Sequence, residues 1–177
     1  MYAIGIDVGT TNCKVCLYRI AGLELIKKHS FITPKKVTEY GSDFDINELW
    51  QGVVNGLSQA ANAVNDPENI VTISVASVGE AGILLDTADN VIGPVMTWYD
   101  TRAQPQRERI VSRISATRLY EITGIPAHST YSLNKILCPT DHTGQPQPAT
   151  WLSMAANIAS RLSGVKRAEY SLASRTL

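Results

Sequence analysis

Residues 2–12 read Tyr2-Ala3-Ile4-Gly5-Ile6-Asp7-Val8-Gly9-Thr10-Thr11-Asn12, and this stretch decides how the chain folds. The apolar run before Asp7 and the second run, Cys13 to Ile20, are rich in residues that favour strands. The Gly, Thr and Asn residues between the two runs are turn formers. The stretch therefore predicts a β-hairpin with its turn directly after Asp7.

The turn of this hairpin carries the groups that a bound polyphosphate needs. Gly9 leaves backbone N–H groups open to phosphate oxygens, and Thr10 and Thr11 add two hydroxyl donors. Because ionised Asp7 only accepts hydrogen bonds, it favours a phosphate nearby only with a hydrated Mg²⁺ between them. Lys14 supplies a compensating positive charge. The alternative interpretation is an ordinary hairpin turn with a solvated lysine.

Composition narrows the classes of function. The chain has 177 residues, 44% of them hydrophobic, which suits one domain with a sizeable core. Sixteen basic and sixteen acidic residues cancel, and no basic block is interleaved with aromatic residues, so a nucleic-acid or anionic-membrane partner is not indicated. With no apolar window long enough to cross a bilayer, we expect a cytoplasmic protein with small molecules or proteins as partners.

Periodicity predicts the remaining elements, starting with a third strand that completes a three-stranded antiparallel meander. Asp45 and Glu48 form a capping-box-like helix start, and Ser163-Gly164 is typical of a helix end. The predictions in chain order are a strand over 23–32, a loop over 33–44, a helix from Asp45 to about Val64, an inner strand over 69–77, strands over 82–86 and 91–98, one or two helices ending at Gly124, a loop over 138–148 and a helix over 149–162.

A second group of residues suits a ligand rich in hydroxyl groups. Glu80 follows the strand over 69–77, and ligands bind at the carboxyl ends of such strands. Its carboxylate can accept hydrogen bonds from two neighbouring hydroxyls, while Trp98 can cover the apolar face of a sugar. Asp100 and Arg102 either contact the ligand or brace the loop. The three histidines, at positions 29, 128 and 142, stand among polar residues and are expected to be solvated.

Several motifs resemble known families. Residues 5–12, GIDVGTTN, resemble the first phosphate-binding hairpin of the actin-like ATPase superfamily. Residues 75–102, with an LLD turn and a WxDxR ending, are similar to the corresponding stretch of FGGY-family carbohydrate kinases. Heat-shock chaperones have no similar stretch. TG at 123–124, KIL at 135–137, RLSG at 161–164 and YSLASRTL at 170–177 extend the resemblance over essentially the whole chain.

The resemblance implies an RNase-H-like α/β fold and a kinase that uses ATP and Mg²⁺ to phosphorylate a sugar, ketose, sugar acid or polyol. It implies phosphate contacts from the hairpin residues named above, with Asp7 holding Mg²⁺ through water. The implied substrate-binding residues are Gly79, Glu80, Trp98, Asp100 and Tyr131. Glu80 falls where glycerol kinases carry a substrate-binding Glu and xylulokinases a His, and Gly79 falls where glycerol kinases carry an Arg, so the substrate stays open.

Family members are much longer, and the resemblance implies that the catalytic base, an Asp, and the adenosine site come from sequence beyond Leu177. We therefore expect residues 1–177 to be an incomplete N-terminal domain, without a catalytic residue of its own, inactive in isolation and prone to self-association, for example as a homodimer. The alternatives are a non-catalytic or vestigial binding domain of the same fold and an actin-like or chaperone-like ATPase without a sugar substrate. In the RNase-H-like fold, the hairpin turn, the Ser77 to Gly82 loop and Trp98 are expected to meet at one cleft.

Overall fold

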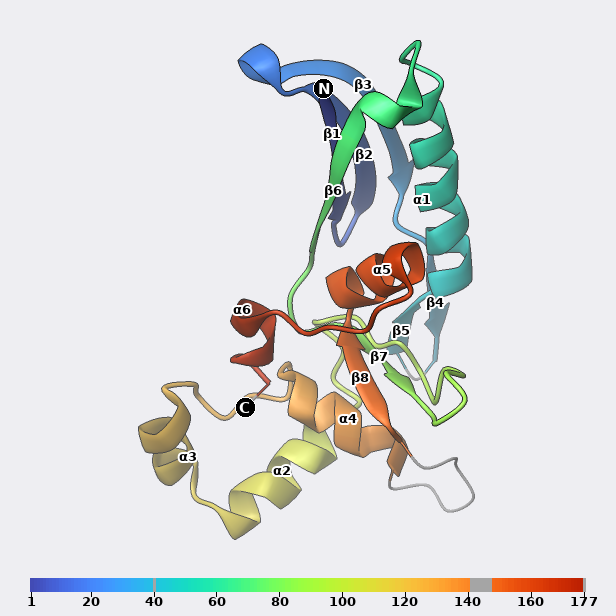
Figure 1. Ribbon diagram of the computed structural model, residues 1–177. Helices are drawn as coiled ribbons and strands as arrows, with labels where there is room; N and C mark the ends of the chain where they lie inside the picture. Colours follow the sequence, from blue (N-terminus) through green and yellow to red (C-terminus); the bar gives the residue numbers. More distant parts are fainter. Residues whose placement is uncertain (40, 141–147, 177) are drawn as a thin grey trace.

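The computed structural model describes residues 1–39, 41–140 and 148–176. Figure 1 shows two regions, a sheet with one long helix beside it and a second region of shorter helices and strands, with α5 between them. The strands are β1 (Tyr2–Val8), β2 (Asn12–Arg19), β3 (Glu24–Ile32), β4 (Lys35–Thr38), β5 (Gly41–Phe44), β6 (Ile70–Ser77), β7 (Gly82–Leu85) and β8 (Thr150–Ser153). The α-helices are α1 (Ile46–Ala61), α2 (Gln104–Arg113), α3 (Ala116–Thr123), α4 (Ser132–Thr140), α5 (Met154–Ser163) and α6 (Tyr170–Ala173), with short 3₁₀ turns at Ala21–Leu23 and Pro67–Asn69.

The main sheet has four strands in the order β3-β2-β1-β6. The predicted meander is confirmed, because β1 pairs antiparallel with β2 and β2 pairs antiparallel with β3. β6 then pairs parallel with β1, so that the carboxyl ends of these two strands lie at the same edge of the sheet. β6 was predicted as an inner strand, but among the described residues it is an edge strand, as β3 is at the other end of the sheet. Its side chains Val71 and Ile73 are exposed as a result.

Helix α1 covers one face of this sheet, and its start is as predicted. The side chain of Asp45 accepts hydrogen bonds from the backbone N–H groups of Asn47 and Glu48. The helix packs over β2 and β3, and Leu49 and Val53 of its apolar stripe share one buried core with alternating residues of β1 and β2 such as Ile6, Val15 and Leu17. This alternation places the residues between them, among them Asp7 and Lys14, on the opposite face of the sheet.

The second region is built on the two-stranded pair of β7 and β8, with α2, α3 and α4 beyond it (Figure 1). Helix α5 follows β8 directly and packs on both β6 and β7, which connects the two regions. The predicted helix ends are confirmed: Gly124 and Gly164 follow α3 and α5 with φ of 71° and 73°, the left-handed conformation that glycine adopts readily.

Several of the predicted elements are wrong. Residues 33–44 were predicted as a loop because they are polar, but β4 and β5 form a hairpin there. Residues 91–98 form only isolated bridges to Leu85 and Asp43 in place of a strand. The segment 149–162 begins with strand β8 before α5, and α4 extends through Thr140 into the predicted loop, whose residues 141–147 lie outside the described ranges. Strand β8 and the bridge from Met96 to Asp43 depend on partners that are distant in the sequence, which local sequence preference does not reveal.

Within the described ranges, none of the helices is both long and apolar enough to span a membrane.

Candidate active-site cleft

Three segments that are far apart in the sequence meet at one cleft. The hairpin turn supplies Thr10, the loop after β6 supplies Gly79 and Glu80, and the segment before α2 supplies Trp98. The indole Nε1 of Trp98 donates a hydrogen bond to Oγ1 of Thr10 at 3.1 Å. The cleft has a volume of about 500 Å³ and is lined by Thr10, Val78, Gly79, Glu80, Trp98, His128, Thr130 and Arg175. The three segments that the sequence predicted to converge therefore do so.

The hairpin turn is held in one shape by its own hydrogen bonds. The N–H of Gly9 donates to the carbonyl of Asn12 at 3.2 Å, and a Cβ on Gly9 would lie 2.6 Å from that oxygen, so only glycine fits. Thr33, directly after β3, fastens the turn by donating its hydroxyl to the Gly9 carbonyl at 2.7 Å and its N–H to the Thr11 carbonyl at 2.9 Å. The Gly9 N–H is thus used within the turn, so phosphate binding stays a prediction for the N–H and hydroxyl groups of Thr10 and Thr11.

Asp7 and Lys14 face each other across β1 and β2, one strand residue before the turn. They are register partners, and Lys14 Nζ lies 3.1 Å from Asp7 Oδ2. Their side chains are 50% and 43% exposed and line a hollow over the uncovered face of the sheet. A single accessible carboxylate beside a lysine fits a hydrated Mg²⁺, which keeps most of its waters and uses few protein ligands.

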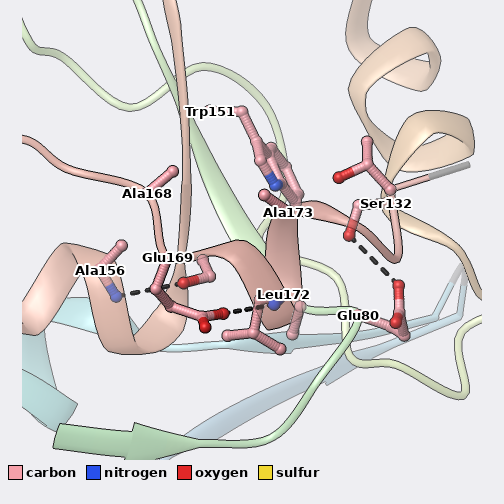
Figure 2. A pocket seen from close by; sticks show the side chains of 11 residues that line it. Glu80, Ser132, Trp151, Ala156, Ala168, Glu169, Leu172 and Ala173 are labelled. Carbon is pink, nitrogen blue, oxygen red and sulfur yellow. Dashed lines mark hydrogen bonds between the residues drawn. The ribbon is translucent and has the colours of Figure 1, made fainter.

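Glu80 forms the opposite wall of the cleft. It follows the carboxyl end of β6 with φ of 58°, a left-handed backbone conformation that is uncommon for a residue with a side chain. Only 8% of its side chain is exposed, and Oε1 accepts a hydrogen bond from Arg175 Nε at 2.8 Å. Figure 2 shows the small cavity behind it, where Ser132 Oγ of α4 approaches Oε2 at 3.4 Å and where Leu172 and Ala173 of α6 contribute to the lining.

Asp100 braces the Trp98 segment. Its side chain is 1% exposed and accepts hydrogen bonds from Arg102 and from the N–H of Ser42 at 2.8 Å. Arg102 also contacts Asp43 of β5, which ties the segment to the β4–β5 hairpin. Burial would raise the pKa of Asp100, but the hydrogen bonds from Arg102 and Ser42 hold it below its ordinary value. Asp100 does not line the cleft, and a contact with substrate stays a prediction.

The segment before α4 forms a third wall, but with other residues than the Tyr131 that the sequence predicted. Tyr131 is absent from the cleft lining, whereas His128 and Thr130 are present. Thr130 donates its hydroxyl to the Trp98 carbonyl, and its N–H donates to His128 Nδ1 at 3.2 Å. His128 is exposed, as predicted, but it is exposed at the cleft. His29, in contrast, is half-buried with Nδ1 at 3.0 Å from Gln59 Nε2, and His142 lies outside the described residues.

Comparisons with known proteins agree with this geometry. Residues 2–177 match the N-terminal domain of the FGGY family of carbohydrate kinases. The chain is 26% identical over 179 residues to a gluconokinase of Bacillus subtilis, covering 99% of this chain and 34% of the relative. It is 28% identical to a xylulose kinase of the same organism, covering 99% of this chain and 36% of the relative. The chain thus spans about a third of the length of the curated relatives it matches.

Solved structures show the same fold. A gluconate kinase from Lactobacillus acidophilus superposes with a TM-score of 0.85 at 26% identity, covering 99% of this chain and 36% of that chain. A xylulose kinase from Rhodospirillum rubrum superposes with a TM-score of 0.88 at 19% identity and covers 99% of this chain and 37% of that chain. The α/β architecture is accordingly the RNase-H-like fold of the actin-like ATPase superfamily, as the hairpin motif predicted. From its matched residues, its fold and the cleft between hairpin and Glu80 loop, this chain belongs to the FGGY family of carbohydrate kinases.

Proposed function

We propose that residues 1–177 form the N-terminal sugar-binding and phosphate-binding part of an ATP-dependent carbohydrate kinase. The observation that carries the proposal is the hydrogen bond from Trp98 to Thr10. It joins the hairpin turn, which is suited to bind phosphate, directly to the indole ring that is suited to contact a sugar. Relatives named gluconokinase, L-fuculokinase and xylulose kinase support the same class of reaction. The acceptor is a hydroxyl group of a sugar, ketose, sugar acid or polyol.

At the phosphate end, the backbone N–H and hydroxyl groups of Thr10 and Thr11 would bind phosphate oxygens of ATP. Lys14 would oppose the negative charge that builds on the transferring phosphoryl group. Asp7 would hold Mg²⁺ through water, and the bound ion would supply charge neutralisation between the phosphates and this carboxylate. The half-exposed side chains of Asp7 and Lys14 leave room for both ligands.

At the sugar end, the indole ring of Trp98 provides an apolar platform, and Glu80 provides the acceptor for hydroxyl groups. One Glu80 oxygen is engaged by Arg175, but the 3.4 Å contact from Ser132 to the other is long for a hydroxyl donor. Each carboxylate oxygen can accept more than one hydrogen bond, so Glu80 keeps capacity to accept a substrate hydroxyl beside Arg175, which lines the same cleft. Gly79 lies beside Glu80 in the lining and leaves space for the ligand.

The base that removes the proton from the acceptor hydroxyl is proposed to come from sequence beyond Leu177, together with the adenosine site. Positioning of nucleotide and acceptor supplies most of the rate acceleration in phosphoryl transfer. We accordingly propose that residues 1–177 are an incomplete N-terminal domain and that the isolated chain does not phosphorylate sugars. A non-catalytic binding domain is the alternative that the following experiment separates.

The test is a coupled assay with ATP, Mg²⁺ and a panel of gluconate, fuculose, xylulose and glycerol. The full-length protein that contains this chain should turn over at least one member of the panel, and residues 1–177 alone should turn over none. A full-length protein inactive on the whole panel, but binding its members in calorimetry, would favour the non-catalytic alternative. Turnover by the isolated chain would contradict the proposal that the catalytic base and the adenosine site come from sequence beyond Leu177.

A further inference from the structure

Lys135 of α4 is a buried cation that joins two walls of the cleft without lining it. The residue is 3% exposed. Its ammonium group donates hydrogen bonds to the backbone carbonyl of Glu80 and to the backbone carbonyl of Thr97, the latter at 3.0 Å. The first carbonyl belongs to the loop after β6, and the second directly precedes Trp98. One side chain therefore connects the two loops that carry the proposed sugar contacts.

Burial of this charge is costly. Removal from water lowers the pKa of Lys135 to about 8, although the nearby carboxylates of Glu80 and Asp100 act in the opposite direction. A methionine would fill a similar volume without a buried charge, and buried charges are retained only with good hydrogen-bond partners. What the ammonium provides, and methionine does not, is donors for two carbonyls from separate loops.

The conformation of Glu80 depends on such an anchor. Its backbone is left-handed, which costs free energy for a residue with a Cβ and persists where the surroundings hold it. The Lys135 bond to the Glu80 carbonyl acts on the backbone, while Arg175 and Ser132 act on the carboxylate. At the other loop, Trp98 is held by Thr10 and Thr130 on its own side of the cleft.

We propose that Lys135 is a positioning residue that sets the separation between the Glu80 carboxylate and the Trp98 indole, and thereby the affinity of the cleft for its sugar. This proposal rests on the proposed function, because it presupposes that the cleft binds a sugar. Lys135 acts through the two carbonyls, since it is not among the residues that line the cleft. Loss of its donors should let the two walls move independently.

The first measurement follows the indole N–H of Trp98 in residues 1–177 by ¹H–¹⁵N correlation spectra, with Trp98→Phe to assign it. Lys135→Met should shift this resonance, while the indole of Trp50 in α1 stays in place. Lys28→Met, at an exposed position of β3, is the matched control and should shift neither. If Lys135→Met does not fold, Lys135→Gln, which keeps a shorter N–H₂ donor, should give a smaller shift in the same direction.

The second measurement uses the full-length kinase. Lys135→Met should raise KM for the sugar about tenfold while kcat and KM for ATP change less than about twofold, and Lys135→Gln should recover part of the loss. A lower melting temperature with unchanged sugar KM and an unmoved Trp98 resonance would make Lys135 a packing residue and overturn the proposal. Absence of any sugar kinase activity would remove the proposed function, while the Trp98 resonance would still decide whether Lys135 holds the two walls.

Discussion

The two sides of the cleft are built in opposite ways. On the hairpin side, Thr10 lines the cleft itself, while Asp7 and Lys14 line a separate hollow over the sheet, are 50% and 43% exposed, and form an ion pair across two strands. On the Glu80 side, the carboxylate is 8% exposed and is approached by Arg175 and Ser132, while Lys135 holds its backbone. One side presents accessible charge, and the other presents a side chain already fixed by its neighbours.

This difference fits the two proposed ligands. A polyphosphate with Mg²⁺ brings its own charge and its own waters, so accessible groups on a rigid turn are sufficient to bind it. A sugar is recognised by hydroxyl groups in fixed directions, which requires acceptors whose positions are set before binding. Ionic interactions should therefore govern the hairpin side, and preorganisation should govern the Glu80 side. The predictions below test that contrast in order of decreasing effect.

The largest effect is expected from the buried charge of Lys135 on stability. Its pKa is about 8 in the folded chain and 10.5 ordinarily, so between these values the unfolded chain binds more protons. The free energy of unfolding should rise with pH across this window, by up to about 3 kcal/mol from this group. Urea unfolding of wild type and Lys135→Met at pH 7.5 and 10 measures it.

The informative quantity in that experiment is the difference between the two proteins. Burial raises the pKa of the Cys13 thiol, which changes stability in the opposite direction and is shared by both proteins. Lys135→Met should lack the rise that wild type shows. Equal pH dependence in the two proteins would mean that Lys135 is not a buried charge and that the Glu80 side is less closed than the structure shows.

The next largest effect is expected at Lys14 in the proposed full-length kinase. Lys14→Met should lower kcat about 100-fold and change KM for the sugar little, because the lysine opposes charge that develops in the transition state. Lys28→Met, on the neighbouring strand, serves as the control and should retain wild-type kcat. Steady-state kinetics at saturating ATP give both constants. Unchanged kcat in Lys14→Met would favour the alternative interpretation, in which Lys14 is a solvated lysine without a role in phosphoryl transfer.

The same contrast explains which parts of the molecule could be predicted from sequence. The hairpin and the capped start of α1 depend on local signals. The hairpin is indicated by the turn of small residues after Asp7, and the helix start by Asp45, whose side chain caps the first turn of α1. The Glu80 wall depends on Lys135 and Arg175, which come from distant segments and have no local signature of their role. The β4–β5 hairpin was likewise predicted as a loop because its residues are polar. It is stabilised by the ion pair of Asp43 with Arg102, which comes from a distant segment.

A smaller effect is expected at Glu80, confined to the sugar. Glu80→Ala should raise KM for the sugar by the equivalent of about 1 to 3 kcal/mol, since a substrate hydroxyl loses its acceptor in a partly desolvated site. KM for ATP should stay near the wild-type value. Arg175→Met gives the matched comparison, because it frees the carboxylate from its partner without removing it. Equal sugar KM in wild type and Glu80→Ala across the substrate panel would show that Glu80 only holds the loop.

The smallest effect is expected at the bond that joins the two sides. Trp98→Phe keeps an aromatic platform but removes the N–H that donates to Thr10 Oγ1, a hydrogen bond contributing about 1 kcal/mol. KM for the sugar should rise only severalfold, whereas the dependence of sugar affinity on bound nucleotide should weaken. Thr10→Ala removes the same bond from the other end, so the double variant should show little further change in this dependence. Fully additive effects of the two substitutions would mean that the hydrogen bond does not couple nucleotide binding to sugar binding. The hairpin turn and the Trp98 segment would then act as two independent binding sites in one cleft.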